Sequence, residues 1–188
     1  MGSTFAIDVP QTTLARLRQG DERAFEQVYR LFERPVYSLA WRMLGDREEA
    51  HEVMHDAMLA VIEKIEQYRE TAPFWGWLRQ IAVNEALMRL RRRKIDYVDE
   101  LPEPANDDHA HSTPFDALAQ HDLVRALDEL PVTTRSVVWL YYVEGLTHDE
   151  IATSFDRSIS FSKSQVMRGT ERLRQLLAPT PTPRVAYA

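Results

Sequence analysis

Two histidines and a glutamate occur in the order His51-Glu52-Val53-Met54-His55, which is the pattern H-E-x-x-H. On a helix, this spacing places two imidazoles one turn apart, where they can bind zinc while the glutamate acts as a general base. The neighbouring residues argue against a hydrolase, because Glu49 and Asp56 are charged where a buried zinc site normally has uncharged residues. No downstream H-x-x-G-x-x-H element completes the pattern. A zinc hydrolase is therefore kept as an alternative that metal analysis would test.

The same segment carries a stripe of carboxylates. At about 100° per residue, four acidic side chains fall on one narrow face of the expected helix, opposite its apolar face. They are Glu49, Glu52, Asp56 and Glu63. A solvated helix face is the simpler interpretation of such a stripe. The alternative is a docking surface for a basic partner.

Aromatic and basic residues lie close together between residues 74 and 94, where FWGWLRQIAVNEAL leads into MRLRRRK. Aromatic rings can stack on bases that are turned out of a duplex, while Arg and Lys hold the backbone. The helical spacing of Trp77 to later apolar residues favours a core position for this ring. Trp75 faces elsewhere and is the better candidate for exposure. The cationic run that follows is often only a solvated helix end, but beside these aromatics we interpret it as a phosphate contact.

The segment Leu127–Leu177 has the pattern of a helix-turn-helix, the motif that places a helix in the DNA major groove. An apolar helix is followed by a glycine turn, a short helix, a tight turn and a long helix rich in polar and basic residues. Thr147 and Glu150 form T-x-x-E, a capping box that fixes the start of the short helix.

The composition of the chain limits the classes of protein to which it can belong. The chain has 188 residues, of which 44% are hydrophobic and 28% charged, so it can bury a core. The absence of Cys excludes disulfides and thiolate zinc sites. No apolar run reaches the roughly 18 residues of a membrane helix, and the N-terminus lacks the pattern of a secretory signal. A cytoplasmic protein without membrane insertion is expected.

The net charge of −6 is unusual for a DNA-binding protein, because phosphate neutralisation supplies much of the affinity. The charge is unevenly distributed, however. Residues 95–120 hold seven acidic residues and no Lys or Arg, which leaves the rest of the chain at +1. The choice of partner therefore depends on the local charge and not on the sum.

Apolar residues recur with helical spacing, and no segment shows the alternating pattern of a strand. We therefore predict an all-α fold with two small helical domains joined by a flexible acidic linker. The predicted boundaries are a disordered N-terminus at 1–10, a first domain at 11–94, the linker at 95–120, a second domain at 121–178 and a disordered tail at 179–188. Within the first domain, Asp21 is expected to cap a helix that Pro35 breaks or restarts. Gly45 is expected to end the next helix, and Asp46 to begin the acidic one.

The motifs, taken in this order, resemble those of bacterial extracytoplasmic-function sigma factors, the small class of the sigma-70 family that retains regions 2 and 4. The resemblance runs from about residue 14 to residue 177. Region 2 of the family ends with F-x-G-W-L-x-x-I-A-x-N, matched from Phe74. Region 4 contains L-x-x-L-P, matched from Leu127, and Y-x-E-G-L-x-x-x-E-I-A, matched from Tyr142.

The resemblance implies a non-enzymatic subunit, without cofactor or metal, that recruits core RNA polymerase to promoter DNA, recognises the −35 and −10 elements and promotes strand opening. It implies docking on the clamp helices of the largest polymerase subunit and on the flap. The acidic linker would thread toward the active-site channel, and an anti-sigma factor would regulate the protein. An ordinary helix-turn-helix regulator, which binds duplex DNA as a dimer, is the alternative. The aromatic and basic segment argues against it, because such a regulator does not hold melted strands.

The resemblance also assigns residues to these roles. Those implied for core polymerase are Glu49, Glu52, Asp56 and Glu63. Those implied for the −10 element are Phe74, Trp75, Arg79, Asn84, Arg89, Arg91 and Arg92. Those implied for the −35 element are Ser158, Ser160, Phe161, Lys163, Ser164, Gln165 and Arg168.

The turn of the helix-turn-helix departs from the family pattern. Asp156 stands where the family usually has Gly, so it must adopt the left-handed conformation at some cost. Ser158 remains a sound N-cap. Ser162 replaces an apolar residue, which predicts a less stable corner. Gln165 replaces Arg, which exchanges a preference for guanine for a bidentate contact to adenine.

Overall fold

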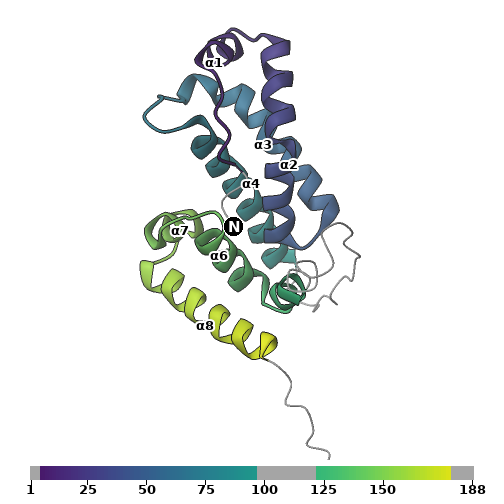
Figure 1. Cartoon of the computed structure of the whole chain (residues 1–188), viewed down its shortest axis with the longest axis vertical. Coiled ribbons are helices and arrows are strands. Elements are labelled where there is room, and N and C mark those ends of the chain that lie inside the picture. Colours follow the sequence, from purple (N-terminus) through teal and green to yellow (C-terminus); the bar gives the residue numbers. More distant parts are fainter. Residues whose placement is uncertain (1–4, 97–121, 179–188) are drawn as a thin grey trace, which may run out of the picture.

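The computed structural model describes residues 5–96 and 122–178, and every regular element in these ranges is helical (Figure 1). The elements are α1 (Gln11–Arg18), α2 (Glu22–Leu44), α3 (Arg47–Lys64), a 3-10 turn (Ile65–Gln67), α4 (Phe74–Asp96), a helix at 122–128, α6 (Val132–Tyr142), α7 (His148–Phe155) and α8 (Ile159–Leu177). The predicted all-α class is confirmed. Most of the predicted linker and the whole predicted tail lie outside the described residues.

Helix α2 begins and ends as the sequence predicts, but Pro35 does not interrupt it. The Asp21 carboxylate accepts a hydrogen bond from the Ala24 amide at 3.0 Å, and Gly45 closes the helix in the left-handed conformation, with φ 71°. The predicted break at Pro35 is wrong, because α2 runs continuously through it. Proline removes one backbone hydrogen bond and crowds the preceding turn. The buried side chains on both sides of Pro35, such as Phe32 and Val36, supply the packing that outweighs this cost.

An aromatic cluster holds the N-terminal half together. The Phe32 ring of α2 is fully buried, and its centroid lies 6.3 Å from that of Phe5 and 5.9 Å from that of Phe74. The predicted disordered N-terminus is therefore wrong for residues 5–10, because Phe5 belongs to the core. Residues 1–4 lie outside the described part of the chain.

Helices α6, α7 and α8 form the helix-turn-helix half of the molecule. Thr147 and Glu150 make the predicted capping box, and the Ser158 hydroxyl caps α8 by accepting from the Phe161 amide at 3.3 Å. Asp156 adopts the left-handed conformation, with φ 52°. Ser162, expected to weaken the corner, is fully buried, and its hydroxyl lies 3.0 Å from Nδ1 of His148. The polar side chain is thus hydrogen-bonded inside the corner.

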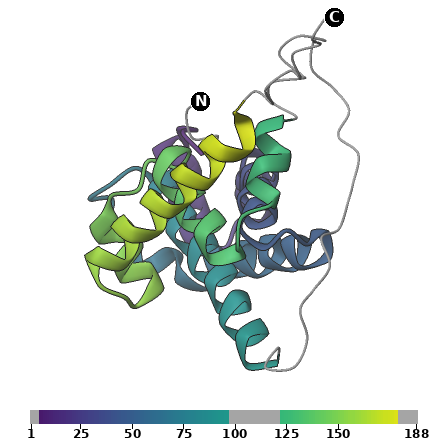
Figure 2. The same cartoon turned by 90° about the horizontal axis from the view of Figure 1, so that it is seen from below.

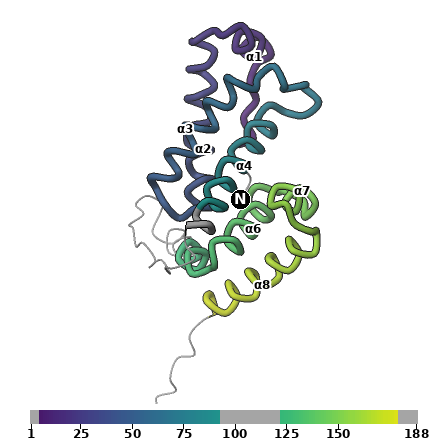
Figure 3. Tube along the Cα trace, turned by 180° about the vertical axis from the view of Figure 1, so that it is seen from behind, coloured from purple at the N-terminus to yellow at the C-terminus, as the bar shows by residue number. Residues whose placement is uncertain are grey.

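The two halves pack against each other in all three views, with α6 beside α2 and α7 beside α4 (Figures 1, 2 and 3). The fully buried Ser136 of α6 donates a hydrogen bond to the Met43 carbonyl of α2 at 3.2 Å. Val137 and Leu140 of α6 are completely buried in the same core as the N-terminal half. The sequence predicted two domains, but it did not predict that they share a core.

Replacing Thr147 by alanine is expected to lower the free energy of unfolding by about 1 kcal/mol at neutral pH, because the capping box is lost. The amide and hydroxyl of Thr147 donate to Glu150 and lower its pKa from the usual 4.5; partial burial opposes this, and the charge of Arg79 adds to it. A lowered carboxyl pKa stabilises the fold above the unfolded-state value, and this contribution is lost as pH falls through the folded-state pKa. The stability difference between variant and wild type should therefore shrink on acidification. Urea unfolding at neutral and acidic pH measures this, and equal stability at neutral pH would contradict it.

Candidate nucleic-acid interface

The acidic stripe of α3 faces a cation from α4. Glu52 and Glu63 are exposed, whereas Glu49 and Asp56 are half-buried. The Arg89 guanidinium bonds to both Glu52 and Asp56, with 2.7 Å between its Nη2 and Oδ2 of Asp56. Burial alone would lower the pKa of Arg89, but the hydrogen bonds and charges of these two carboxylates outweigh it and raise that pKa. Arg89, which we predicted as a DNA contact, therefore neutralises part of the stripe in this arrangement.

The histidines of the H-E-x-x-H pattern lie at the exposed side of α3. The His51 ring packs 4.5 Å from the ring of Tyr37 on α2, and His55 is exposed. Within the described ranges, no three His, Cys, Asp or Glu side chains are grouped so that they could hold a metal ion. The described residues thus supply no third protein ligand to these histidines.

The aromatic residues at the start of α4 divide between core and surface. Phe74 is buried, with its ring centroid 5.5 Å from that of Tyr68 and 5.6 Å from that of Trp77. The assignment of Phe74 to DNA is therefore corrected, because its ring has no free face to stack on a base. Trp75 is half-buried, and the Arg79 guanidinium lies over its ring at 5.2 Å. Trp77 is also half-buried against the core, which agrees with its predicted core position.

Three side chains of α4 bind the C-terminal half of the molecule. Arg79 donates to the Glu144 carbonyl oxygen, and Arg91 donates to the Ser154 carbonyl oxygen at 3.1 Å. Gln80 Nε2 donates to the Ser154 hydroxyl at 3.0 Å. Burial lowers the pKa of Arg79, although the carboxylates of Glu144 and Glu150 oppose this shift. The predicted DNA contacts Asn84 and Arg92 are exposed on the same helix.

Helix α8 presents one polar face to solvent and packs the other on α6. Ser160, Lys163 and Arg168 are exposed, as a DNA-reading helix requires, whereas Ser164 is half-buried. Phe161 is half-buried, with its ring centroid 5.7 Å from that of Phe155.

The side chain of Gln165 turns inward from α8. Its Oε1 accepts a hydrogen bond from the Thr134 hydroxyl of α6 at 2.7 Å, and the side chain is half-buried. In this arrangement Gln165 binds another helix of the protein, and its adenine contact stays a prediction. Two residues turn a helix by about 200°, so Gln165 faces away from the exposed Lys163.

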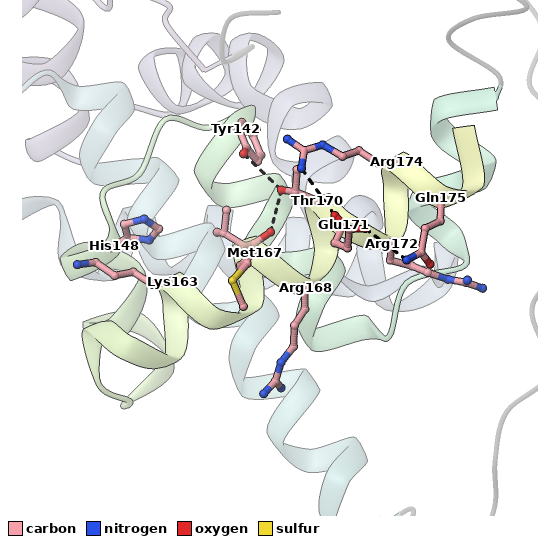
Figure 4. A pocket seen from close by; sticks show the side chains of 11 residues that line it. Tyr142, His148, Lys163, Met167, Arg168, Thr170, Glu171, Arg172, Arg174 and Gln175 are labelled. Carbon is pink, nitrogen blue, oxygen red and sulfur yellow. Dashed lines mark hydrogen bonds and ion pairs between the residues drawn. The ribbon is translucent and has the colours of Figure 1, made fainter. Parts of the chain in front are cut away.

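An open groove of about 690 Å³ runs along the exposed face of α8 (Figure 4). His148 and Lys163 lie at one end of it and Arg172, Arg174 and Gln175 toward the other, with Tyr142, Met167, Arg168 and Glu171 between. The His148 ring stacks on Tyr141 at 4.5 Å, which holds it at the rim. Sequence reasoning missed Met167, which is 67% exposed, although its i+4 spacing from Lys163 places both on one face.

Known proteins share both halves of this arrangement. The family model of Sigma-70 region 2 matches residues 28–95, and that of Sigma-70, region 4 matches residues 120–173. The ECF RNA polymerase sigma factor SigE of Mycolicibacterium smegmatis is 31% identical over 179 residues, covering 91% of this chain and 69% of that protein. The chain is an extracytoplasmic-function sigma factor of the sigma-70 family.

Further relatives agree with this membership. The sigma factor is 26% identical to SigW of Bacillus subtilis over 176 residues, covering 87% of this chain and 94% of that protein. Its fold is similar to that of the sigma factor RpoE in complex with the anti-sigma factor NepR from Bartonella quintana, with a TM-score of 0.61, 23% identity and coverage of 81% and 96%. CnrH, solved with the cytosolic domain of CnrY, gives a TM-score of 0.53 at 21% identity, with coverage of 88% and 95%.

Membership in this family establishes what the protein does. It is a promoter-specificity subunit that binds core RNA polymerase and promoter DNA and directs transcription initiation. Sigma factors as a class are non-enzymatic initiation factors. No helix in the described ranges is long and apolar enough to span a membrane.

Proposed function

We propose that this sigma factor docks on the clamp helices of core RNA polymerase through the acidic stripe of α3. The supporting observation is that three of its carboxylates, those of Glu49, Glu52 and Asp56, lie within two turns of one helix face and are at most half-buried. Glu63 extends the stripe by two further turns and is exposed. Arg89 binds Glu52 and Asp56 in the free protein, so a basic surface of the polymerase would take over these carboxylates.

The two halves would read different promoter elements. On α4, Trp75, Arg79, Asn84, Arg91 and Arg92 are proposed to hold the −10 strand, with Trp75 supplying the stacking face and the cations the phosphate contacts. On α8, Ser160, Lys163 and Arg168 are proposed to contact the −35 element, because they share the exposed face, with Ser158 and Ser164 beside them. The half-buried Phe161 is proposed to contact a thymine methyl.

The remaining roles follow from the family. The sigma factor is proposed to act in the cytoplasm, where the polymerase is, and to have no catalytic activity of its own. Both solved neighbours are bound to other proteins, RpoE to an anti-sigma factor and CnrH to the cytosolic domain of CnrY. This supports the proposal that an anti-sigma factor also regulates this chain.

The experiment that tests the docking surface is co-elution of the purified protein with bacterial core RNA polymerase. Replacing both Glu52 and Asp56 by alanine should weaken binding about tenfold, because each exposed ion pair contributes up to about 1 kcal/mol. The matched control replaces Glu26 and Glu33 of α2 by alanine, which removes the same charge from another helix. Circular dichroism confirms that each variant is folded. Equal binding by both variants would show that the acidic stripe of α3 is not the docking surface. A wild-type protein that does not bind core polymerase would count against the proposed mode of action.

A further inference from the structure

Part of the face of α4 that is proposed to bind the −10 strand contacts the C-terminal half, through Arg79 and Arg91, whereas Asn84 and Arg92 stay exposed beside these contacts. Two guanidinium groups of α4, those of Arg79 and Arg91, donate to peptide carbonyl oxygens of the C-terminal half. The two acceptors belong to Glu144, just beyond the end of α6, and to Ser154, in the last turn of α7. Backbone carbonyl oxygens carry a partial negative charge, and those in the last turn of a helix, such as that of Ser154, have no partner within the helix. They offer arginine the same kind of acceptor as a phosphate oxygen.

The acceptor for Arg79 is held in a fixed position. Glu144 is buried, at 4% exposure, and its carboxylate accepts a hydrogen bond from Nε1 of Trp139 at 3.2 Å. The Arg42 guanidinium of α2 lies 5.4 Å from the centroid of the Trp139 ring. The carboxylates of Glu144 and Glu150 act on Arg79 in addition to the carbonyl. Arg79, which is proposed to bind DNA, therefore lies in a negatively charged environment that other residues of the same chain provide.

The residue that accepts from Arg91 through its carbonyl oxygen also binds a second side chain of α4, through its hydroxyl. The Ser154 hydroxyl receives the Gln80 amide at 3.0 Å and itself donates to the Glu150 carbonyl at 2.8 Å. Ser154 is buried by these contacts, at 8% exposure. Arg79, Gln80 and Arg91 thus bind the C-terminal half along a little over three turns of α4.

We propose that, in the protein without DNA, the C-terminal half binds the DNA-binding face of α4. The carbonyl oxygens at the carboxyl-terminal ends of α6 and α7 then accept the hydrogen bonds that phosphates of the −10 strand would otherwise accept. This proposal rests on the assignment of α4 to the −10 strand. The strand and the C-terminal half then compete for Arg79 and Arg91. The free protein binds a single strand only in the fraction of molecules whose halves have separated, so its apparent affinity is reduced by that fraction.

A cross-link between the halves tests this competition directly. The chain contains no Cys, so a Gln80→Cys, Ser154→Cys double variant has only two thiols, at positions whose native side chains are in hydrogen-bond contact. A short bis-maleimide joins them after folding. The control is a Thr134→Cys, Gln165→Cys variant, whose native side chains are also hydrogen-bonded but both lie in the C-terminal half. Each protein is compared with its own unlinked form by fluorescence anisotropy, with a short labelled DNA single strand of mixed sequence, and by co-elution with core polymerase.

The expected result is that the cross-link between the halves weakens strand binding at least about tenfold, while the control cross-link leaves it unchanged. Strand binding that survives the cross-link between the halves would overturn the proposal, as would an equal loss in the control. Failure of the bis-maleimide to join the halves would show that they are not neighbours in solution and would also overturn it. An unlinked protein that binds core polymerase but does not bind the strand even in that complex would remove the role of α4 in DNA binding. An unlinked protein that binds neither would instead count against the proposed function itself.

Discussion

Replacing Phe32 by alanine is expected to lower the free energy of unfolding by about 3–5 kcal/mol. Phe32 is fully buried, and its ring contacts both the N-terminal segment, through Phe5, and the start of α4, through Phe74. The cavity left by alanine would loosen both attachments at once. Because Phe74 fixes the first turn of α4, the variant should also lose order around Trp75.

Urea unfolding followed by circular dichroism measures the effect of Phe32→Ala. The matched control is Phe25→Ala, on the same helix, where the ring is only half-buried and a cost of about 1 kcal/mol is expected. Equal losses in the two variants would show that the aromatic cluster does not hold this half together.

Replacing Gly169 by alanine is expected to cost about 1–3 kcal/mol, although alanine normally favours a helix. A Cβ atom at Gly169 of α8 would lie 2.4 Å from a methyl of Val138 and 3.0 Å from the methyl of Thr134, both on α6. Val138 is buried and β-branched, so its methyl cannot move aside without shifting the helix. The two helices would separate, and the Thr134–Gln165 hydrogen bond would be strained.

Gly76→Ala in α4 is the matched control, because a Cβ there meets no atom within 4 Å. That substitution should stabilise the protein by about 0.5–1 kcal/mol through helix propensity alone. Thermal unfolding of both variants should therefore give shifts of opposite sign. Val138→Ala, combined with Gly169→Ala, should recover part of the loss, and a stabilising effect of Gly169→Ala by itself would contradict the close packing of α6 and α8.

The elements and their ends could be predicted because they depend on local chemistry. Asp21, Asp46 and Thr147 each cap a helix through their own side chains, and Gly45 ends one in the left-handed conformation. These contacts span only a few residues, so they can be read from the sequence without knowledge of the fold. Lys163 and Arg168, which are exposed, were instead assigned to DNA only through the resemblance to the family.

The errors arose where tertiary packing decided the outcome. Pro35 lies inside α2 because buried neighbours compensate for the lost hydrogen bond, and that burial is not visible locally. Phe5 and Phe74 meet across Phe32, although all three are far apart in the sequence. The hydrogen bond between Gln165 and Thr134 of another helix likewise could not be read from the motif that assigned Gln165 to DNA. The contact between the halves could not be predicted from the sequence, because Arg79 and Arg91 donate to backbone carbonyl oxygens. Every residue has such an oxygen, so no residue type marks the position of the acceptor.

Helix α6 packs on α2 through Ser136 and on α8 through Val138, so the direction of α8, the helix proposed to bind the −35 element, is set by the N-terminal half. In promoter DNA, each base pair added between two elements turns one against the other by about 35° and separates them by about 3.4 Å. While α6 stays packed on α2, the distance and angle between α4 and α8 are fixed. The protein in that state can fit at most one length of DNA between the −10 and −35 elements. If α6 separates from α2, the two halves can be positioned independently on the DNA. The lengths of DNA between the two elements that the protein accepts then depend on the chain that connects the halves.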